Sequence, residues 1–353
     1  MNQGAHVLLF PEMVVTGYPV EDLALRPAFR RASRDAVSRI AHQAAEVGAG
    51  EMLLIVGYLD ENPQPENAVA VIHQGKVVAK YVKRHLPNYG VFDEFRNFVP
   101  GQGSLVVRHG DVDIAIAICE DIWQDSGVVP EIAARKPGLV LVANASPYER
   151  KKDDRRLALV QKRAREFASP LVYVNQVGAQ DDLVFDGDSV IVDSEGKVLA
   201  RAPQFESDIF ITDVDVLTAT SKPDVDLTST LRIPRENVKP LLTERLSDEE
   251  EMWTALVIGL RDYIGKNGFT SVALGLSGGI DSAVVATLAV DALGKDRVFG
   301  VSLPSKYSSE HSLSDAKSLA SNLGIEYRVI EIEPVVQSFL KATTLSGVAE
   351  ENV

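Results

Sequence analysis

The stretch from Val112 to Trp123, VDIAIAICEDIW, constrains the fold of this chain more than any other. The apolar residues between Val112 and Ile118 are mostly β-branched, which predicts a strand buried on both faces. The run delivers Cys119, the only cysteine of the chain, at the tip of this strand. A thiol that is held rigidly at a strand end is well placed to act as a nucleophile. The alternative is that Cys119 is a buried small apolar residue, because a lone cysteine needs a positioned base to act in catalysis.

Strand-forming sequence dominates the chain up to about residue 216. The expected strands are 7–10, 52–59, 68–73, 76–83, 105–107, 112–118, 139–143, 171–175, 189–192, 198–202 and 209–214. Amphipathic helices are expected over 26–47, 129–135 and 153–168. Gln74 and Gly75 predict a tight hairpin. The aperiodic segment 84–103, rich in Pro, Gly and aromatic residues, predicts an ordered loop, and loops of this length are usually functional.

A different order of predicted elements begins after a proline-containing segment, 217–246, which we interpret as a linker. Helices over 248–266, 282–293, 312–323 and 334–343 alternate with strands over 271–276, 298–303 and 326–332. Alternation of strand and helix is typical of a doubly wound parallel sheet that binds ligands at the carboxyl ends of its strands. The chain is therefore expected to be an α/β protein with two domains, 1–216 and 247–353.

Composition excludes several classes of protein. A formal net charge of −14 argues against sequence-independent binding to nucleic acid or to an anionic membrane surface. No apolar run approaches membrane-spanning length. A single cysteine rules out an internal disulfide framework and fits a reducing compartment. We therefore expect a cytoplasmic protein.

Three polar residues stand at the ends of expected strands of the first domain: Glu12, Lys83 and Cys119. Because strand ends gather at one rim of an α/β layer, these side chains can converge. A carboxylate could accept the thiol proton, and a lysine could stabilise the negative charge that develops during attack. Taken singly, Glu12 could equally be a turn cap and Lys83 a solvated strand end.

Five segments in this order carry a resemblance to a known family. They are FPEMVVTGYP around Glu12, KRHLPNYGVFDE from Lys83, ICEDIW around Cys119, NASPYERKKD from Asn144 and VNQVGAQDDLVFDGDS from Val174. The chain resembles the nitrilase superfamily, and more closely the glutaminase domain of the glutamine-dependent NAD synthetases. The resemblance implies an αββα sandwich with a Glu-Lys-Cys triad that hydrolyses the side-chain amide of glutamine.

The resemblance also implies roles for individual residues. Glu12 would be the general base, Cys119 would form a glutamyl thioester, and Lys83 would stabilise the oxyanion together with the backbone N–H that follows the nucleophile. Glu94 matches the supporting acid of the superfamily. Glutamine recognition is assigned to Tyr89, Ser146, Tyr18, Glu120 and Lys152. Tyrosines near Gly and Pro could equally serve packing.

The second domain contains Ser277-Gly278-Gly279-Ile280-Asp281-Ser282 between an expected strand and helix. Glycines allow close approach of the backbone to a phosphate, and the helix N-terminus favours its negative charge. An ordinary strand-to-helix turn is the alternative. The loop resembles that of the ATP pyrophosphatases and lacks the GK[ST] of a Walker loop. The resemblance places ATP at Gly275, Leu276, Ser277, Gly278, Gly279, Ile280, Asp281, Ser282 and Leu303, with Mg²⁺ on Asp281.

The complete reaction implied is that of a ligase: nicotinate adenine dinucleotide, ATP and glutamine would yield NAD, AMP, pyrophosphate and glutamate, with ammonia channelled between sites in a homo-oligomer. The family pattern extends beyond both ends of this sequence. We therefore expect the glutaminase domain to lack its first strand and helix and the synthetase domain to be partial, so that this chain alone would not complete the reaction. The alternatives are another nitrilase-type amidotransferase with a different adenylated acceptor, or a non-catalytic remnant.

Overall fold

The computed structural model describes residues 4–227, 238–304 and 309–343. Contacts divide the chain into two compact units, Met1–Glu249 and Glu250–Val353. Short 3₁₀ helices accompany the main elements: η1 (Glu21–Leu25), η2 (Glu94–Arg96), η3 (Cys119–Ile122) and η4 (Lys295–Arg297). No helix within the described ranges is both long and apolar enough to span a membrane. The predicted boundaries at 216 and 247 stay predictions.

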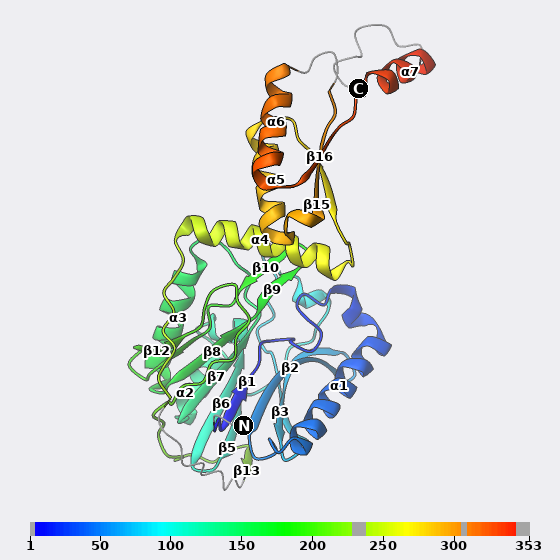
Figure 1. Cartoon of the computed structure of the whole chain (residues 1–353). Coiled ribbons are helices and arrows are strands. Elements are labelled where there is room, and N and C mark those ends of the chain that lie inside the picture. Colours follow the sequence, from blue (N-terminus) through cyan, green and yellow to red (C-terminus); the bar gives the residue numbers. More distant parts are fainter. Residues whose placement is uncertain (1–3, 228–237, 305–308, 344–353) are drawn as a thin grey trace. The chain divides into compact units, whose positions relative to one another are not determined.

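The first sheet of the first unit has the order β1-β2-β3-β4, with β1 parallel to β2 and the other pairs antiparallel. Its strands are β1 (Val7–Leu9), β2 (Leu53–Glu61), β3 (Pro65–His73) and β4 (Lys76–Val82). Gln74 and Gly75 join β3 to β4 with positive φ angles of 47° and 76°, as a two-residue hairpin requires. Helix α1 (Pro27–Glu46) covers the outer face of this sheet (Figure 1).

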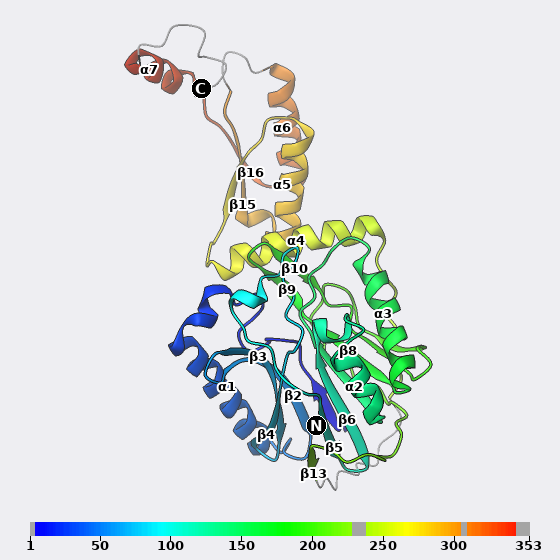
Figure 2. The same ribbon diagram turned by 180° about the vertical axis from the view of Figure 1, so that it is seen from behind.

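The second sheet has the order β12-β11-β8-β7-β6-β5-β13. Its strands are β5 (Leu105–His109), β6 (Val112–Ile118), β7 (Leu139–Asn144), β8 (Leu171–Asn175), β11 (Val190–Val192), β12 (Val198–Arg201) and β13 (Val225–Leu227). Helices α2 (Val128–Arg135) and α3 (Lys152–Phe167) pack on its outer face, as Figure 2 shows from behind. A separate hairpin pairs β9 (Val177–Gln180) with β10 (Leu183–Asp186).

Strand β6 shows how the sequence builds the layers. Ile114, Ile116 and Ile118 point into the core between the two sheets. Ala115 and Ala117 face the opposite way, into the core beneath α2 and α3. Bulky side chains thus fill the space between the sheets, and small ones let the helices approach. The result is the predicted αββα sandwich.

Two local predictions differ from the structure. The expected strand 209–214 is wrong, because this described segment forms no strand. Its apolar side chains are partly buried, since Ile211 packs beneath α1 and Val214 packs between the two sheets. A strand also needs a neighbouring strand to which its backbone can hydrogen-bond. Conversely, β13 lies within the segment interpreted as a linker and pairs in parallel with β5. Local propensity predicts neither the lack of a partner strand for 209–214 nor the pairing of β13 with β5.

The second unit contains a three-stranded parallel sheet in the order β14-β15-β16. Its elements are β14 (Val272–Gly275), α5 (Ile280–Leu293), β15 (Val298–Ser302), α6 (Glu310–Leu323), β16 (Glu326–Val329) and α7 (Glu333–Thr343), preceded by α4 (Asp248–Lys266). Ala286 and Ala289 of α5 and Ala316 of α6 pack with Val298 in one core. The alternation of strands and helices agrees with the predicted α/β fold.

Candidate active site

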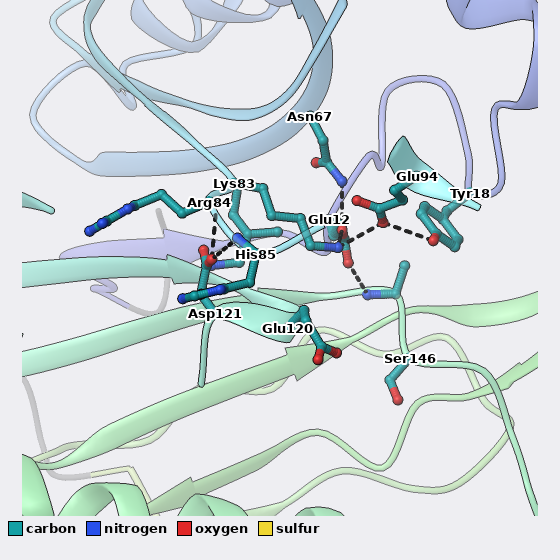
Figure 3. Close-up of polar contacts among 12 residues, drawn as sticks. Glu12, Tyr18, Asn67, Lys83, Arg84, His85, Glu94, Glu120, Asp121 and Ser146 are labelled. Atoms are coloured by element: carbon teal, nitrogen blue, oxygen red, sulfur yellow. Dashed lines mark hydrogen bonds and ion pairs between the residues drawn. The ribbon is translucent and has the colours of Figure 1, made fainter. Parts of the chain in front are cut away.

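Three strand ends of the first unit carry the residues expected to be catalytic. Lys83, directly after β4, places Nζ 2.8 Å from Oε1 of Glu12 and 2.7 Å from Oε1 of Glu94 (Figure 3). All three side chains are buried. Burial opposes the charge of Lys83, but the carboxylates of Glu12 and Glu94 raise its pKa well above the ordinary value. The amine therefore stays an ammonium ion between two carboxyl groups.

Glu12 is held on both of its oxygens. Oε1 accepts a second hydrogen bond, of 2.7 Å, from Nδ2 of Asn67, and Oε2 accepts one of 3.0 Å from the backbone N–H of Ala145. Asn67 lies on β3 and is fully buried. The sequence interpretation missed this residue. The available signal was a polar amide directly before the apolar run 68–73.

Cys119 begins the turn η3 at the end of β6, with a φ of 43°. A residue other than glycine rarely adopts this left-handed conformation, which is commonest at functional sites. Burial and the charge of Glu12 raise the pKa of the Cys119 thiol well above its ordinary value, and Lys83 opposes them. The resting group is thus a thiol, so nucleophilic attack requires a base to remove its proton.

Glu94 forms the second contact of Lys83 and also accepts a 2.8 Å hydrogen bond from the hydroxyl of Tyr18. Burial raises the pKa of Glu94 from 4.5 to about 7, although the charge of Lys83 lowers it. Tyr18, expected to recognise glutamine, therefore contacts the residue expected to be the supporting acid. Glu94 changes its charge near neutral pH while remaining buried.

The pKa of Glu94 predicts a pH-dependent stability difference. Below pH 4.5 the carboxyl is protonated in both the folded and the unfolded chain. As the pH rises towards 7, the unfolded chain ionises first, so the stabilising contribution of Glu94 falls. We therefore expect Glu94→Gln, which mimics the protonated acid, to gain stability relative to the unsubstituted chain between pH 5 and pH 8. Urea denaturation at the two pH values measures this difference, and a difference independent of pH would contradict the assignment.

The residues expected to recognise glutamine come from several loops. The hydroxyl of Tyr89 donates a 2.8 Å hydrogen bond to Oε2 of Glu120, although the Tyr89 ring is 56% exposed. Ser146 follows Ala145, and its amide donates to Oδ1 of Asn175 at 2.8 Å. The first contact joins the side chains of Tyr89 and Glu120, and the second fixes the backbone of Ser146.

Lys152 begins α3 and completes this set. Its Nζ lies 5.7 Å from the centre of the Phe92 ring. Burial lowers the pKa of Lys152, while a negative charge on Cys119 would raise it, so the amine lies within electrostatic reach of Cys119. A cation here can attract the carboxylate of an amino acid substrate.

The second unit contains a cavity of about 400 Å³ at the carboxyl ends of β14 and β15. Its lining is Gly275, Leu276, Ser277, Val301, Ser302, Leu303, Pro304, Ser309, Ser312 and Leu313. Four of the predicted ATP-binding residues are therefore in the wall: Gly275, Leu276, Ser277 and Leu303. The other five, residues 278–282, form the turn that opens α5.

Hydrogen bonds fold this turn tightly. Oγ of Ser277 accepts from the amide of Gly279 at 3.2 Å and lies 3.1 Å from Oγ of Ser282. Gly278 has a φ of 82°, and a Cβ placed there would lie 2.3 Å from the backbone oxygen of Ser312. Only glycine fits this position, because it is both left-handed and crowded.

The predicted magnesium site contains a single carboxylate. In the described part of the chain, no group of three or more His, Cys, Asp or Glu residues gathers as a metal cage. Asp281 stands in the first turn of α5. Mg²⁺ commonly takes one or two carboxylates together with substrate phosphates. The donor set therefore fits a magnesium ion that arrives with a nucleotide.

Comparison with known proteins agrees with this division. Residues 1–223 match the carbon-nitrogen hydrolase family, and residues 252–353 match NAD synthase. The chain is 39% identical to the glutamine-dependent NAD(+) synthetase of Aquifex aeolicus, with 100% of this chain and 65% of the relative covered. For the Thermotoga maritima enzyme the identity is also 39%, with 98% and 62% covered.

A solved structure gives the same result. The glutamine-dependent NAD+ synthetase of Acinetobacter baumannii, in complex with adenosine diphosphate, superimposes with a TM-score of 0.84 at 34% identity, covering 99% of this chain and 64% of that one. The chain thus spans slightly less than two thirds of the length of these relatives. The matched hydrolase segment makes up more than half of the chain and includes Glu12, Lys83 and Cys119. The chain belongs to the carbon-nitrogen hydrolase family, and its sequence and fold are similar to those of glutamine-dependent NAD(+) synthetases.

Proposed function

We propose that the first unit hydrolyses glutamine to glutamate and ammonia, with Cys119 as the nucleophile. The observation that supports this most strongly is the buried ammonium of Lys83, bonded to Glu12 and Glu94 at 2.8 and 2.7 Å and within electrostatic reach of Cys119, the only cysteine of the chain. This arrangement supplies a base, a cation and a nucleophile in one place. The family membership and the similarity to glutamine-dependent relatives point to the same reaction.

In the acylation step, Glu12 accepts the proton of the Cys119 thiol while sulfur attacks the side-chain amide carbon of glutamine. The amide oxygen becomes an oxyanion, which Lys83 and the backbone N–H of Glu120 stabilise. Glu12 then donates its proton to the leaving nitrogen as the C–N bond breaks, so ammonia departs and a thioester remains. The hydrogen bonds from Asn67 and Ala145 hold the Glu12 carboxylate in one orientation through both proton transfers.

Deacylation repeats these roles with water. Glu12 removes a proton from a water molecule, and the hydroxide attacks the thioester carbon. The carbon–sulfur bond then breaks, glutamate leaves, and the proton on Glu12 returns to Cys119. The ammonium of Lys83 stabilises the oxyanion in both halves of the reaction, which is why its charge must persist near neutral pH.

The amino acid end of glutamine requires charged and polar partners. Glu120 and Tyr89, linked at 2.8 Å, can bind the α-ammonium. Lys152 can bind the α-carboxylate, with Ser146 as a further polar contact. Glu120 is buried, so a substrate that lacks the α-ammonium would leave its carboxylate without this partner, which favours an amino acid substrate.

We further propose that the second unit binds ATP with Mg²⁺ at the cavity beside Ser277. There it contributes to adenylation of the nicotinate carboxylate of nicotinate adenine dinucleotide, which releases pyrophosphate. Ammonia then displaces AMP to give NAD. Asp281 would hold the magnesium ion, and the α5 N-terminus would face the phosphates. The relative solved with adenosine diphosphate supports the nucleotide assignment. A homo-oligomer and a cytoplasmic location belong to this proposal.

A glutamine-analogue electrophile tests the first part of the proposal. We expect 6-diazo-5-oxo-L-norleucine to alkylate Cys119 and to abolish release of glutamate and ammonia from glutamine. Peptide mass spectrometry locates the adduct, and excess glutamine should protect against it. Absence of both the adduct and the hydrolysis would contradict the proposal. Hydrolysis that persists after complete alkylation would also contradict it.

Substitution of Gly278 tests the nucleotide site. Gly278→Ala forces a left-handed alanine, and its Cβ would collide with the backbone oxygen of Ser312 at 2.3 Å. We expect ATP affinity, measured by calorimetry with Mg²⁺, to fall by at least about tenfold, because the turn must open. Gly265→Ala is the matched control, since a Cβ at this position would meet no atom within 4 Å other than those of its chain neighbours and its own helix backbone. Equal ATP affinity of Gly278→Ala and the unsubstituted chain would contradict the assignment.

A further inference from the structure

A third acidic residue of the first unit, Asp121, is fully buried and accepts four hydrogen bonds. Its Oδ1 accepts from the backbone N–H groups of Arg84 and His85 at 3.0 and 2.9 Å. Its Oδ2 accepts from the backbone N–H of Ile118 at 3.1 Å and from the Tyr81 hydroxyl at 2.8 Å. Figure 3 shows the carboxylate beside Arg84 and His85, on the opposite side of Lys83 from Glu94 and Tyr18.

The positions of these donors in the chain are informative. Arg84 and His85 directly follow Lys83 at the end of β4, which belongs to the first sheet. Ile118 directly precedes Cys119 at the end of β6, which belongs to the second sheet. One side chain therefore joins the two strand ends that carry the ammonium and the thiol, across the interface between the sheets.

The contacts favour a carboxylate, although burial raises the pKa of Asp121. Three of the partners are backbone N–H groups, which can only donate. All four partners donate, and an ionised aspartate offers two oxygens with about four acceptor sites and no donor. An asparagine would turn N–H groups towards either the Arg84 and His85 amides or the Ile118 amide. Because a backbone amide cannot change from donor to acceptor, at least one strand end would lose its contact.

The same contacts also fix the turn that presents the thiol. The bond from Ile118 to Asp121 closes the first turn of η3 around Cys119. Cys119 keeps its left-handed φ of 43° only while the surrounding structure holds it. Asp121 thus acts on the conformation of Cys119 as well as on its position relative to Lys83.

We propose that Asp121 is a positioning residue for the amide hydrolysis: it tethers the Lys83 and Cys119 strand ends, and so sets the geometry of ammonium and thiol without contacting the substrate. The proposal rests on the proposed glutaminase function. It assigns a catalytic consequence to a residue outside the Glu12, Lys83 and Cys119 set. In this proposal the hydrogen bonds from Arg84, His85 and Ile118 to Asp121 have a catalytic purpose, because these residues adjoin Lys83 and Cys119.

Asp121→Asn in the full chain tests this proposal. We expect kcat for glutamine hydrolysis to fall about 10- to 100-fold, the effect of losing hydrogen bonds to a charged group, with KM within about threefold. Alkylation of Cys119 by iodoacetamide should move to higher pH, because the thiolate loses its alignment with the Lys83 ammonium. A residue with a purely structural role would not shift this pH profile in a protein that stays folded.

Two control variants separate positioning from loss of stability. Asp113→Asn alters another fully buried aspartate at the opposite end of β6, where it binds Arg108, and should leave kcat and the alkylation profile unchanged. Among the described residues, Tyr81 is the one side-chain donor to Asp121. Tyr81→Phe removes it and leaves the three backbone contacts, so kcat should change less than about threefold. Equal losses in Asp121→Asn and in either control would overturn the proposal.

The remaining outcomes are also decisive. A folded Asp121→Asn with unchanged kcat and alkylation profile would overturn the proposal. If Asp121→Asn shows no cooperative melting, Asp121→Glu replaces it, because the charge is kept and the oxygens move by one methylene. A folded Asp121→Glu should again lose kcat, and failure of both variants to fold would show that Asp121 serves the fold as a whole.

If the unsubstituted chain hydrolyses no glutamine, the proposed function fails, while the alkylation profiles still test the tether.

Discussion

Cys119→Ala is expected to reduce glutamine hydrolysis by at least about 10,000-fold, since removal of a catalytic nucleophile eliminates the covalent path. The fold should persist, because the side chain is small and its neighbours in the core between the sheets remain. Release of glutamate measures the loss, and a thermal melt checks the fold. In a form of the protein that completes NAD synthesis, synthesis from free ammonia should continue while synthesis from glutamine stops.

ATP binding provides the internal control for this variant. Calorimetric titration with ATP and Mg²⁺ should give the same affinity for Cys119→Ala and the unsubstituted chain, because Cys119 lies in the other unit. Residual hydrolysis within about tenfold of the unsubstituted chain would show that Cys119 is not the nucleophile. Equal loss of glutamine- and ammonia-dependent synthesis would contradict the assignment of hydrolysis and amidation to separate sites.

Lys83→Met is expected to abolish hydrolysis and to destabilise the first unit by about 3–5 kcal/mol, the usual cost of leaving buried charges without their partner. Methionine fills much of the lysine volume, so the loss arises from the carboxylates of Glu12 and Glu94, which are 1% and 3% exposed. Urea denaturation at pH 8 measures the effect on stability. Adding Glu94→Gln to Lys83→Met should recover part of the stability, because one uncompensated charge is removed.

Lys80 offers a matched control on the same strand. Its Nζ also binds two carboxylates, Asp60 at 2.8 Å and Glu66 at 2.6 Å, but its side chain is 34% exposed. Asp60 and Glu66 are buried as well, but solvent partly screens the more exposed Lys80 amine, so Lys80→Met should cost less than Lys83→Met and leave hydrolysis unchanged. If Lys80→Met and Lys83→Met destabilise equally, or if Lys83→Met retains hydrolysis, the role assigned to the buried ammonium is wrong.

Local sequence features predicted most of the framework. The β-branched run of β6, the Gln74-Gly75 hairpin and the strand-helix alternation of the second unit depend on side-chain period and backbone preference, which are properties of neighbouring residues. The prediction of a strand over 209–214 was wrong for the same reason. A periodic pattern of apolar residues shows that a segment is buried but not that a partner strand lies beside it.

The sequence alone also placed Glu12, Lys83 and Cys119 at strand ends, and the motifs around them assigned their chemistry. Only the tertiary structure showed the contacts that organise the site. Glu12 is 55 residues from Asn67 and 71 from Lys83 in the chain, and Asp121 meets Arg84 only because β4 and β6 end at the same rim. Such contacts depend on which strands pair and which face each side chain takes. Since a buried polar group must find its partner wherever the fold brings one, its role is decided by packing rather than by its neighbours in sequence.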